Sequence, residues 1–241
     1  MKITFYPLGE AAVKCCFPED ISAALTNHIQ SFCKKLDPHK HLGITEWVPA
    51  YDSVTIYYEP WKLSYEQITN VLQPIANEMD THHQRTKTVI TIPTVYGSNF
   101  GPDLENLAAA NNLSTKDVIN LHTKCHYLIN MIGFLPGFPY LSGLDERIAM
   151  PRFENPRQSV PAGSVGIAES QTGIYPLESP GGWNLIGRTP LTLFDAEKEE
   201  PFLFEQGDYL QFKAISEDEY KQIQREMENG TYKLERREES E

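Results

Sequence analysis

The chain has 241 residues, of which 40% are hydrophobic and 22% are charged, and its formal net charge is −12. This acidic balance argues against binding to nucleic acid or to an anionic membrane surface, because both need a clustered basic face. The 12 Tyr, 11 Phe and 3 Trp supply ample surface to bury, which excludes a disordered chain. We therefore expect an acidic, soluble, globular protein with one large or two small domains.

Targeting and membrane signals are absent from the sequence. Pro7 and Glu10 interrupt any apolar core of an N-terminal signal peptide. The longest uncharged run, 127–144, contains five Gly and Pro residues, which makes a membrane-spanning helix implausible. The four cysteines form neither a disulfide framework nor a CxxC motif, which is typical of a reducing compartment. These features predict a cytoplasmic location.

Residues 1–85 predict a small α/β domain in the order β-β-α-β-β-α. A helix is expected at 19–36, with an apolar stripe that includes Ile21. Ser64 and Gln67 form a capping-box pattern for a second helix, which Pro74 should kink or end early. Strands are expected at 2–6, 11–17, 47–50 and 54–58. This order favours a ferredoxin-like sandwich.

A polar stretch at 80–87 is interpreted as a linker to a second domain at 88–230. That domain should open with a strand at 88–93, followed by two helices, the first starting at Pro102 and the second capped by Ser114. Nine of the 15 glycines then lie between residues 133 and 187. Helices do not tolerate this density of Gly, whereas tight turns between short strands require it. The second domain is therefore predicted to be a β-barrel or sandwich.

The clearest strands of this domain are expected at 165–168, 191–194 and 209–212. Ser216 with Glu219 should cap a last helix that stops at Gly230. The remaining residues, 231–241, are highly charged and predict a frayed tail.

The stretch HTKCH offers a candidate metal site. His122 and His126 have the i, i+4 spacing that places two imidazoles on one face of a helix, and Cys125 could add a ligand. However, the Glu of a metalloprotease helix is missing and no fourth ligand is visible, so we predict no metal. The chain also lacks the GxSxG, GxxxxGK[ST] and GxGxxG motifs, which argues against a nucleophile elbow or a phosphate loop. If ATP is used, another chain should bind it.

Polar residues interleaved with Gly and Pro form the candidate site. An Arg guanidinium there could hold a carboxylate or phosphate through its bidentate fork. Equally, buried Arg and Glu side chains could pair to hold irregular loops together. Nearby aromatic residues, Phe134, Phe138, Tyr140 and Trp183, could line a groove for a peptide or fill a core. The candidate polar residues are Arg157, Gln171, Tyr175, Glu178, Ser179 and Arg188.

Two long segments carry a resemblance to a known family: GFLPGFPYLSGL at 133–144 and VPAGSVGIAESQTGIYPLESPGGWNLIGR at 160–188. Together they closely resemble the KipI family, also called allophanate hydrolase subunit 1, or the B subunit of the bacterial ATP-dependent 5-oxoprolinase. Arg152 and Arg157 also fit, whereas Glu169 departs from the pattern, which suggests a small residue such as Gly there. The resemblance implies a small N-terminal α/β domain and a cyclophilin-like β-barrel C-terminal domain.

The resemblance also implies a function. Members of the 5-oxoprolinase system work with its A and C subunits to open 5-oxoproline to glutamate, using ATP as co-substrate. No metal or bound cofactor is expected in this chain, and we expect it to be inactive alone. The alternative is a KipI-type inhibitor of a sensor histidine kinase, countered by a KipA partner, which resembles the C subunit of the oxoprolinase system. A role in carboxyl transfer on biotinylated partners is a further alternative.

Within the oxoprolinase hypothesis, Arg157 and Arg188 would neutralise charge that develops on the activated lactam. Gln171 and Glu178 would orient substrate or water, and Tyr175 would contribute to substrate binding. His122 lies where the family pattern also has His and would be an acid or base. Replacing either arginine with Ala is then expected to cripple the assembled enzyme while leaving folding intact.

Overall fold

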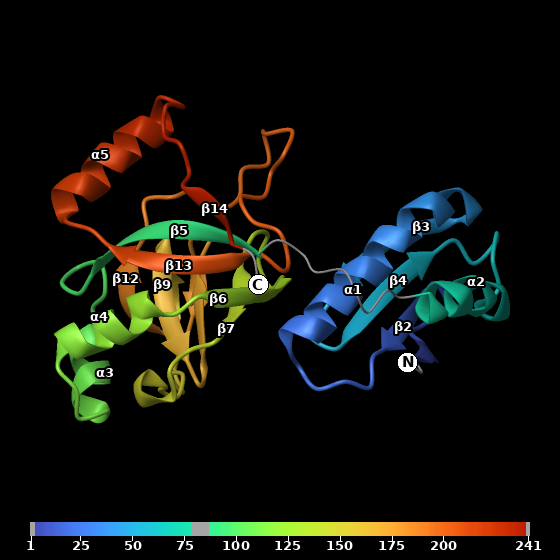
Figure 1. The fold of residues 1–241 in the computed structure, drawn as a ribbon, viewed down its shortest axis with the longest axis horizontal. Coiled ribbons are helices and arrows are strands. Elements are labelled where there is room, and N and C mark those ends of the chain that lie inside the picture. Colours follow the sequence, from blue (N-terminus) through green and yellow to red (C-terminus); the bar gives the residue numbers. More distant parts are fainter. Residues whose placement is uncertain (1–2, 79–86, 240–241) are drawn as a thin grey trace. The chain divides into compact units, whose positions relative to one another are not determined.

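The computed structural model describes residues 3–78 and 87–239 (Figure 1). The chain forms two compact units, Met1–Arg85 and Thr86–Glu241, and each is described by itself. The segment interpreted as a linker, 80–87, lies outside the described residues except for Lys87, which begins the first strand of the second unit.

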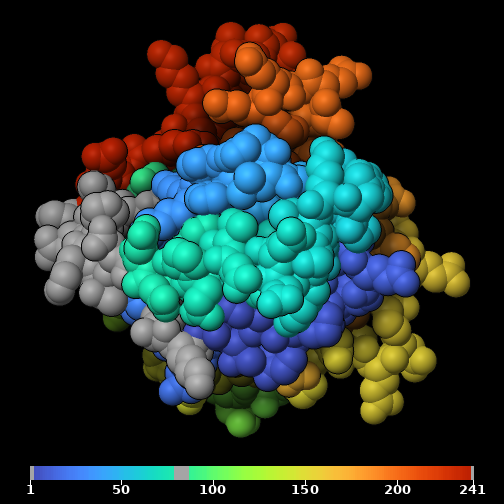
Figure 2. All heavy atoms as spheres, turned by 90° about the vertical axis from the view of Figure 1, so that its right-hand side faces the viewer, coloured from blue at the N-terminus to red at the C-terminus, as the bar shows by residue number. Residues whose placement is uncertain are grey.

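The N-terminal unit is a four-stranded antiparallel sheet with two helices packed against it. Its strands are β1 (Thr4–Pro7), β2 (Ala12–Cys16), β3 (Ile44–Pro49) and β4 (Ser53–Tyr58), in the spatial order β1-β2-β4-β3. The helices are α1 (Ala23–Leu36), followed by the short 3-10 helix η1 (Asp37–Leu42), and α2 (Tyr65–Asn77). Figure 2 shows this unit in space-filling form, with α2 in teal on the visible face. The predicted order β-β-α-β-β-α is confirmed.

Two details of these helices differ from the prediction. Helix α1 begins at Ala23 rather than at residue 19, because the Ser22 side chain accepts the Leu25 N–H at 3.2 Å and caps the helix. Ile21 therefore lies outside the helix and is 58% exposed. Helix α2 continues past Pro74 to Asn77. Because Pro74 has no backbone N–H, the Asn70 carbonyl has no helical hydrogen-bond donor. Both residues are exposed, so water can satisfy that carbonyl.

The C-terminal unit is a closed barrel of seven strands, and an eighth strand, β14, pairs with the first half of β5. Around the barrel the order is β12-β9-β10-β7-β6-β13-β5, and pairing of β12 with β5 closes the ring. Strands β5 and β13 run parallel (Figure 1). The bounds are β5 (Lys87–Tyr96), β6 (Tyr127–Ile132), β7 (Pro139–Ser142), β9 (Ser164–Ala168), β10 (Gln171–Ile174), β12 (Asn184–Arg188), β13 (Tyr209–Ala214) and β14 (Arg236–Glu239).

Helices and a small ribbon surround this barrel. Helix α4 (Thr115–Lys124) is capped by Ser114 and α5 (Glu217–Glu228) by Ser216, as predicted. The remaining elements are α3 (Leu104–Ala110), the 3-10 helix η2 (Glu146–Ile148), β8 (Arg157–Val160) and β11 (Ser179–Gly181). Strands β8 and β11 pair as a separate two-stranded ribbon. Within the described residues, no helix combines the length and apolar character needed to cross a membrane.

Two predictions about the second unit are wrong. Residues 191–194 form no strand; Leu191 and Leu193 are buried, and only Phe194 forms an isolated bridge, with Phe202. The alternation of apolar side chains at 191 and 193 therefore reflects burial of an irregular segment and not a paired strand. The tail predicted to fray contains β14, which pairs antiparallel with the first half of β5. The ten-residue β5 leaves that edge open, and Arg237 on β14 donates to Gln211 Oε1 at 2.6 Å.

Candidate functional site

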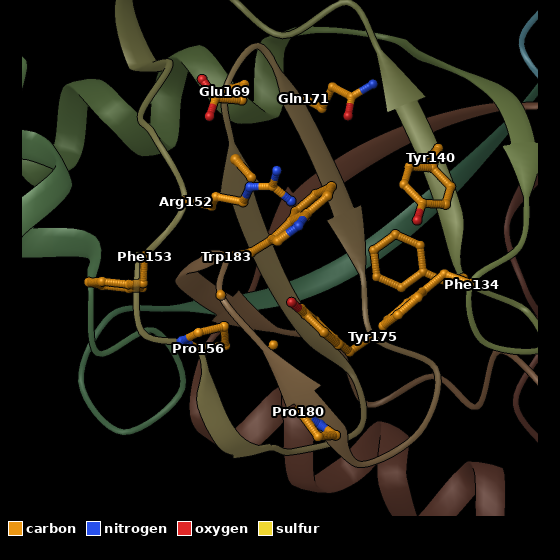
Figure 3. A pocket seen from close by; sticks show the side chains of 14 residues that line it. Phe134, Tyr140, Arg152, Phe153, Pro156, Glu169, Gln171, Tyr175, Pro180 and Trp183 are labelled. Atoms are coloured by element: carbon orange, nitrogen blue, oxygen red, sulfur yellow. The ribbon is translucent and has the colours of Figure 1, made fainter.

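A cavity of about 520 Å³ lies beside the barrel in the C-terminal unit (Figure 3). Its lining comes from five stretches of chain: the residues around the start of β7, residues 152–156 ahead of β8, the turn between β9 and β10, Tyr175 directly after β10, and residues 180–183 from β11 to the start of β12. All of these stretches except residues 152–156 belong to the two long segments that carry the family resemblance. The Gly-rich and Pro-rich sequence therefore builds a concave site, as loops on a rigid scaffold often do.

Six of the residues that line the cavity are aromatic. The Phe138 ring is central, and its centroid lies 5.4 Å from that of Tyr175 and 5.5 Å from that of Trp183, both edge to face. Phe134 packs edge to face on the same ring at 5.9 Å and remains 69% exposed. Of these aromatics, Phe138 fills a small core together with Tyr175, whereas Phe134 lines the cavity.

Glycine allows this wall to close. A Cβ atom at Gly173 would lie 3.0 Å from the Trp183 ring and 3.1 Å from the Phe138 ring. A side chain at Gly181 would collide with the Tyr175 hydroxyl. The glycines of the QTGIYP and SPGGW strings are therefore required for close packing of the rings.

Polar side chains form the other part of the cavity. Arg152, Glu169 and Gln171 all contribute to the lining, and Figure 3 shows Arg152 reaching toward its middle. Sequence reasoning missed Arg152 and Glu169 as site residues. The signal for Glu169 was its departure from the family pattern: its φ is +53°, the left-handed conformation that favours glycine.

Two of the residues predicted to bind substrate, Gln171 and Tyr175, do line this cavity. Burial raises the pKa of the Tyr175 hydroxyl, so this group stays protonated at neutral pH and is able to donate a hydrogen bond. These two residues keep a place in the candidate site.

Arg157 lies behind the cavity wall. Its guanidinium forms an ion pair of 2.5 Å with Oδ1 of Asp103, which is 4% exposed. The other oxygen, Oδ2, accepts the Leu185 N–H at 2.7 Å. The guanidinium also lies 4.7 Å from the ring centroid of Phe153, a residue of the cavity lining. Arg157 therefore holds together three separate segments and supports the wall.

Arg188 and Glu178 do not line the cavity. Arg188 ends β12, and its guanidinium carbon lies 5.9 Å from the ring centroid of Phe100. Glu178 accepts a hydrogen bond of 2.7 Å from the Ser159 hydroxyl across the β8–β11 ribbon. The charged residues that the sequence analysis placed in one candidate site, Arg157, Glu178 and Arg188, thus lie outside the cavity lining.

His122 is fully buried in the barrel core. Its Nδ1 lies 2.8 Å from the Tyr96 hydroxyl and its Nε2 lies 2.9 Å from the Thr172 hydroxyl. Burial lowers the pKa of the imidazole to about 3, so the ring is neutral at physiological pH. Because both nitrogens are occupied and water is excluded, this geometry does not support the predicted acid or base role.

The metal pattern also fails to form in space. Helix α4 ends at Lys124, and Cys125 is already extended, so the i, i+4 spacing does not bring His126 beside His122. His126 instead contacts the Arg237 guanidinium at 3.0 Å. Among the residues that the structure describes, no group of three His, Cys, Asp or Glu side chains is arranged to hold a metal ion.

Comparison with known proteins gives three kinds of match: to a protein family, to named proteins and to a solved structure. Residues 3–204 match the family described as carboxyltransferase domain, subdomain C and D. The B subunit of 5-oxoprolinase from Bacillus subtilis (strain 168) is 38% identical over 223 residues, covering 88% of this chain and 93% of that protein. The corresponding B subunit from Escherichia coli O157:H7 is 39% identical over 208 residues, covering 86% and 94%.

A solved structure, TTHA0988, is 34% identical and superposes with a TM-score of 0.75. The match covers 85% of this chain but only 40% of that one, so the fold described here forms part of a longer polypeptide in TTHA0988. With a family match over most of the sequence and relatives at nearly 40% identity, the chain belongs to the family of carboxyltransferase subdomains C and D, and within it to the family of the 5-oxoprolinase B subunits.

Proposed function

We propose that this chain is the B subunit of an ATP-dependent 5-oxoprolinase, which converts 5-oxoproline to glutamate together with the A and C subunits of that enzyme. The relatives that match along nearly their whole length bear the name of this component. The structural observation that carries the proposal is the cavity, whose aromatic wall and polar side chains suit a small ring with polar substituents.

The chemistry explains why a partner is needed. The lactam of 5-oxoproline is an unreactive amide, so its oxygen has to be activated, for example by phosphorylation, before water attacks the carbonyl carbon. That activation needs a site for ATP, and the sequence carries no phosphate loop of its own. We therefore assign ATP binding to a partner chain, and we expect this chain to be inactive alone and to act as part of a hetero-oligomer.

Within this proposal, Gln171 and Tyr175 contact the substrate, and Arg157 is a positioning residue behind the wall. We further propose that the enzyme acts in the cytoplasm. The four-stranded unit and the seven-stranded barrel are compatible with the ferredoxin-like and cyclophilin-like labels that the resemblance implies, and those labels are part of the proposal.

The test is release of glutamate from 5-oxoproline by this chain mixed with the A and C subunits, with each chain and ATP omitted in turn. Turnover should require all four. Gln171→Ala should lower turnover about tenfold, because it removes a polar contact in the cavity. Gln158→Ala is the matched control, since Gln158 is exposed on β8 and outside the lining, and it should leave turnover unchanged.

Absence of turnover from a folded, assembled mixture would contradict the proposal. In that case, binding to the dimerisation domain of a sensor histidine kinase becomes the function to measure. Equal turnover by Gln171→Ala and by the parent would instead show that the reaction takes place away from this cavity.

A further inference from the structure

The backbone that carries Arg152 is fixed at three points. Met150 and Glu169 exchange two backbone hydrogen bonds, of 2.7 Å and 3.2 Å, which join this segment to the β9–β10 turn. The Asn184 side-chain amide donates to the Pro151 carbonyl at 2.9 Å, and the Phe153 N–H donates to the Gly182 carbonyl at 2.7 Å. Arg152 is therefore presented from a rigid support, next to the turn that carries Glu169.

The Arg152 guanidinium has no hydrogen bond or ion pair with any described residue. Two nearby arginines differ: Arg147 pairs with Asp145 and Arg157 pairs with Asp103. Figure 3 shows the Arg152 side chain extending into the cavity toward Trp183. Arg152 is an exposed residue, and a free guanidinium at the mouth of a cavity is well suited to bind a carboxylate through two parallel hydrogen bonds.

Glu169 contributes a second unpaired charge to the same cavity. Its backbone has the left-handed φ of +53°, and the bridge to Met150 holds it in that conformation. Its carboxylate, like the Arg152 guanidinium, has no hydrogen bond or ion pair with the described residues. A carboxylate can only accept hydrogen bonds, so it suits a ligand that presents an N–H. Strained residues of this kind often occur at binding sites.

We propose that these two residues select the ligand, an inference that rests on the function proposed above. Arg152 binds the carboxylate of 5-oxoproline, and Glu169 accepts a hydrogen bond from the lactam N–H, while the aromatic wall packs against the ring. The cavity is thereby specific for a five-membered lactam that bears a carboxylate. Neither residue takes part in bond making; both are binding residues.

The test compares two ligands with the full chain by calorimetry or ligand-detected NMR. L-5-oxoproline has the lactam and the carboxylate, whereas 2-pyrrolidinone has the same lactam alone. The parent chain should bind 5-oxoproline more tightly. Arg152→Gln should weaken 5-oxoproline binding at least tenfold, because the ligand carboxylate loses its charge-assisted pair. Binding of 2-pyrrolidinone should stay unchanged, because this ligand has no carboxylate. Arg147→Gln is the control, since Arg147 lies outside the cavity, and it should change neither affinity.

Glu169→Gly gives an independent test that does not threaten the fold, because glycine suits a φ of +53°. It should weaken the binding of both ligands alike, by several-fold, since both present the lactam N–H.

If Arg152→Gln weakened the binding of the two ligands equally, or of neither, the inference would be overturned. It would also be overturned if the parent bound no 5-oxoproline, either alone or in the mixture with the A and C subunits. Carboxylate-dependent binding without turnover would contradict the proposed function and leave this inference standing.

Discussion

Replacing His122 with Gln should make the C-terminal unit lose less stability in acid than the parent chain loses. The buried imidazole has its pKa lowered from 6.5 to about 3. Between these two pH values the unfolded chain binds a proton that the folded chain does not bind. The free energy of unfolding of the parent therefore falls as the pH falls through this window, and the loss is complete below pH 3.

Burial keeps His122 neutral, and the hydrogen bonds around it fix which ring nitrogen carries the proton. The Thr172 hydroxyl donates its single hydrogen to the Gly166 carbonyl at 3.0 Å, so its oxygen accepts from Nε2–H of the imidazole. Nδ1 then accepts from the Tyr96 hydroxyl. Protonating Nδ1 would force the Tyr96 hydroxyl to turn its hydrogen away and would bury a charge among the rings of Tyr127 and Phe212.

The measurement is urea unfolding at pH 7.5 and pH 4.5. Fluorescence of Trp183 reports on this unit alone in a chain whose Trp47 and Trp61 are replaced by Phe. From pH 7.5 to 4.5 the parent should lose about 3 kcal/mol more than His122→Gln does. At pH 7.5 the variant should be less stable by about 2 kcal/mol, because the packed ring is lost.

Imidazole NMR supplies the outcome that would contradict this account. The His122 resonances should show the Nε2–H tautomer throughout the range from pH 7.5 to pH 5. Titration of these resonances with a midpoint near 6.5, or an equal loss of stability in parent and variant, would show that the ring is accessible to water. In that case a role for His122 in proton transfer would need to be reconsidered.

Local sequence patterns predicted the parts of this fold that depend on neighbours in the chain. The capping boxes at Ser64, Ser114 and Ser216 all form, because each needs only a partner three residues away. For a similar reason the Gly-rich region predicted a β-barrel or sandwich, since glycine spacing reports on turns directly, but it could not decide between the two. Strand β14 was missed because an edge strand rich in charge depends on an open partner strand that only the fold supplies.

The candidate site was predicted in part. The aromatic strings and the residues Gln171 and Tyr175 belong to the cavity, and their sequence neighbourhood was sufficient to find them. The role of Arg157 depends on Asp103, which lies 54 positions earlier in the sequence, so composition could not separate a ligand-binding arginine from a paired one. The free arginine, Arg152, is distinguished only by the absence of such a partner among the described residues.

This pairing leads to a second large expected effect: Arg157→Ala should destabilise the C-terminal unit by about 2–3 kcal/mol. Removing one partner of a buried ion pair leaves the other charge uncompensated, which costs about 3–5 kcal/mol when both groups are fully buried. Here Asp103 is buried, whereas the Arg157 side chain is 31% exposed. Water therefore screens part of this ion pair, and the expected loss of stability is smaller. The sequence-based expectation was the reverse, a loss of activity with folding intact.

The same Trp183 unfolding measurement at pH 7.5 tests this, with two matched variants. Arg147→Ala removes the arginine of a pair at the surface, where Arg147 is 65% exposed, and should cost less than about 1 kcal/mol. Adding Asp103→Asn to Arg157→Ala should recover part of the lost stability, because the amide oxygen can still accept the Leu185 N–H without burying a charge. If Arg157→Ala cost no more than Arg147→Ala and yet abolished turnover, Arg157 would act on the substrate rather than on the wall of the cavity.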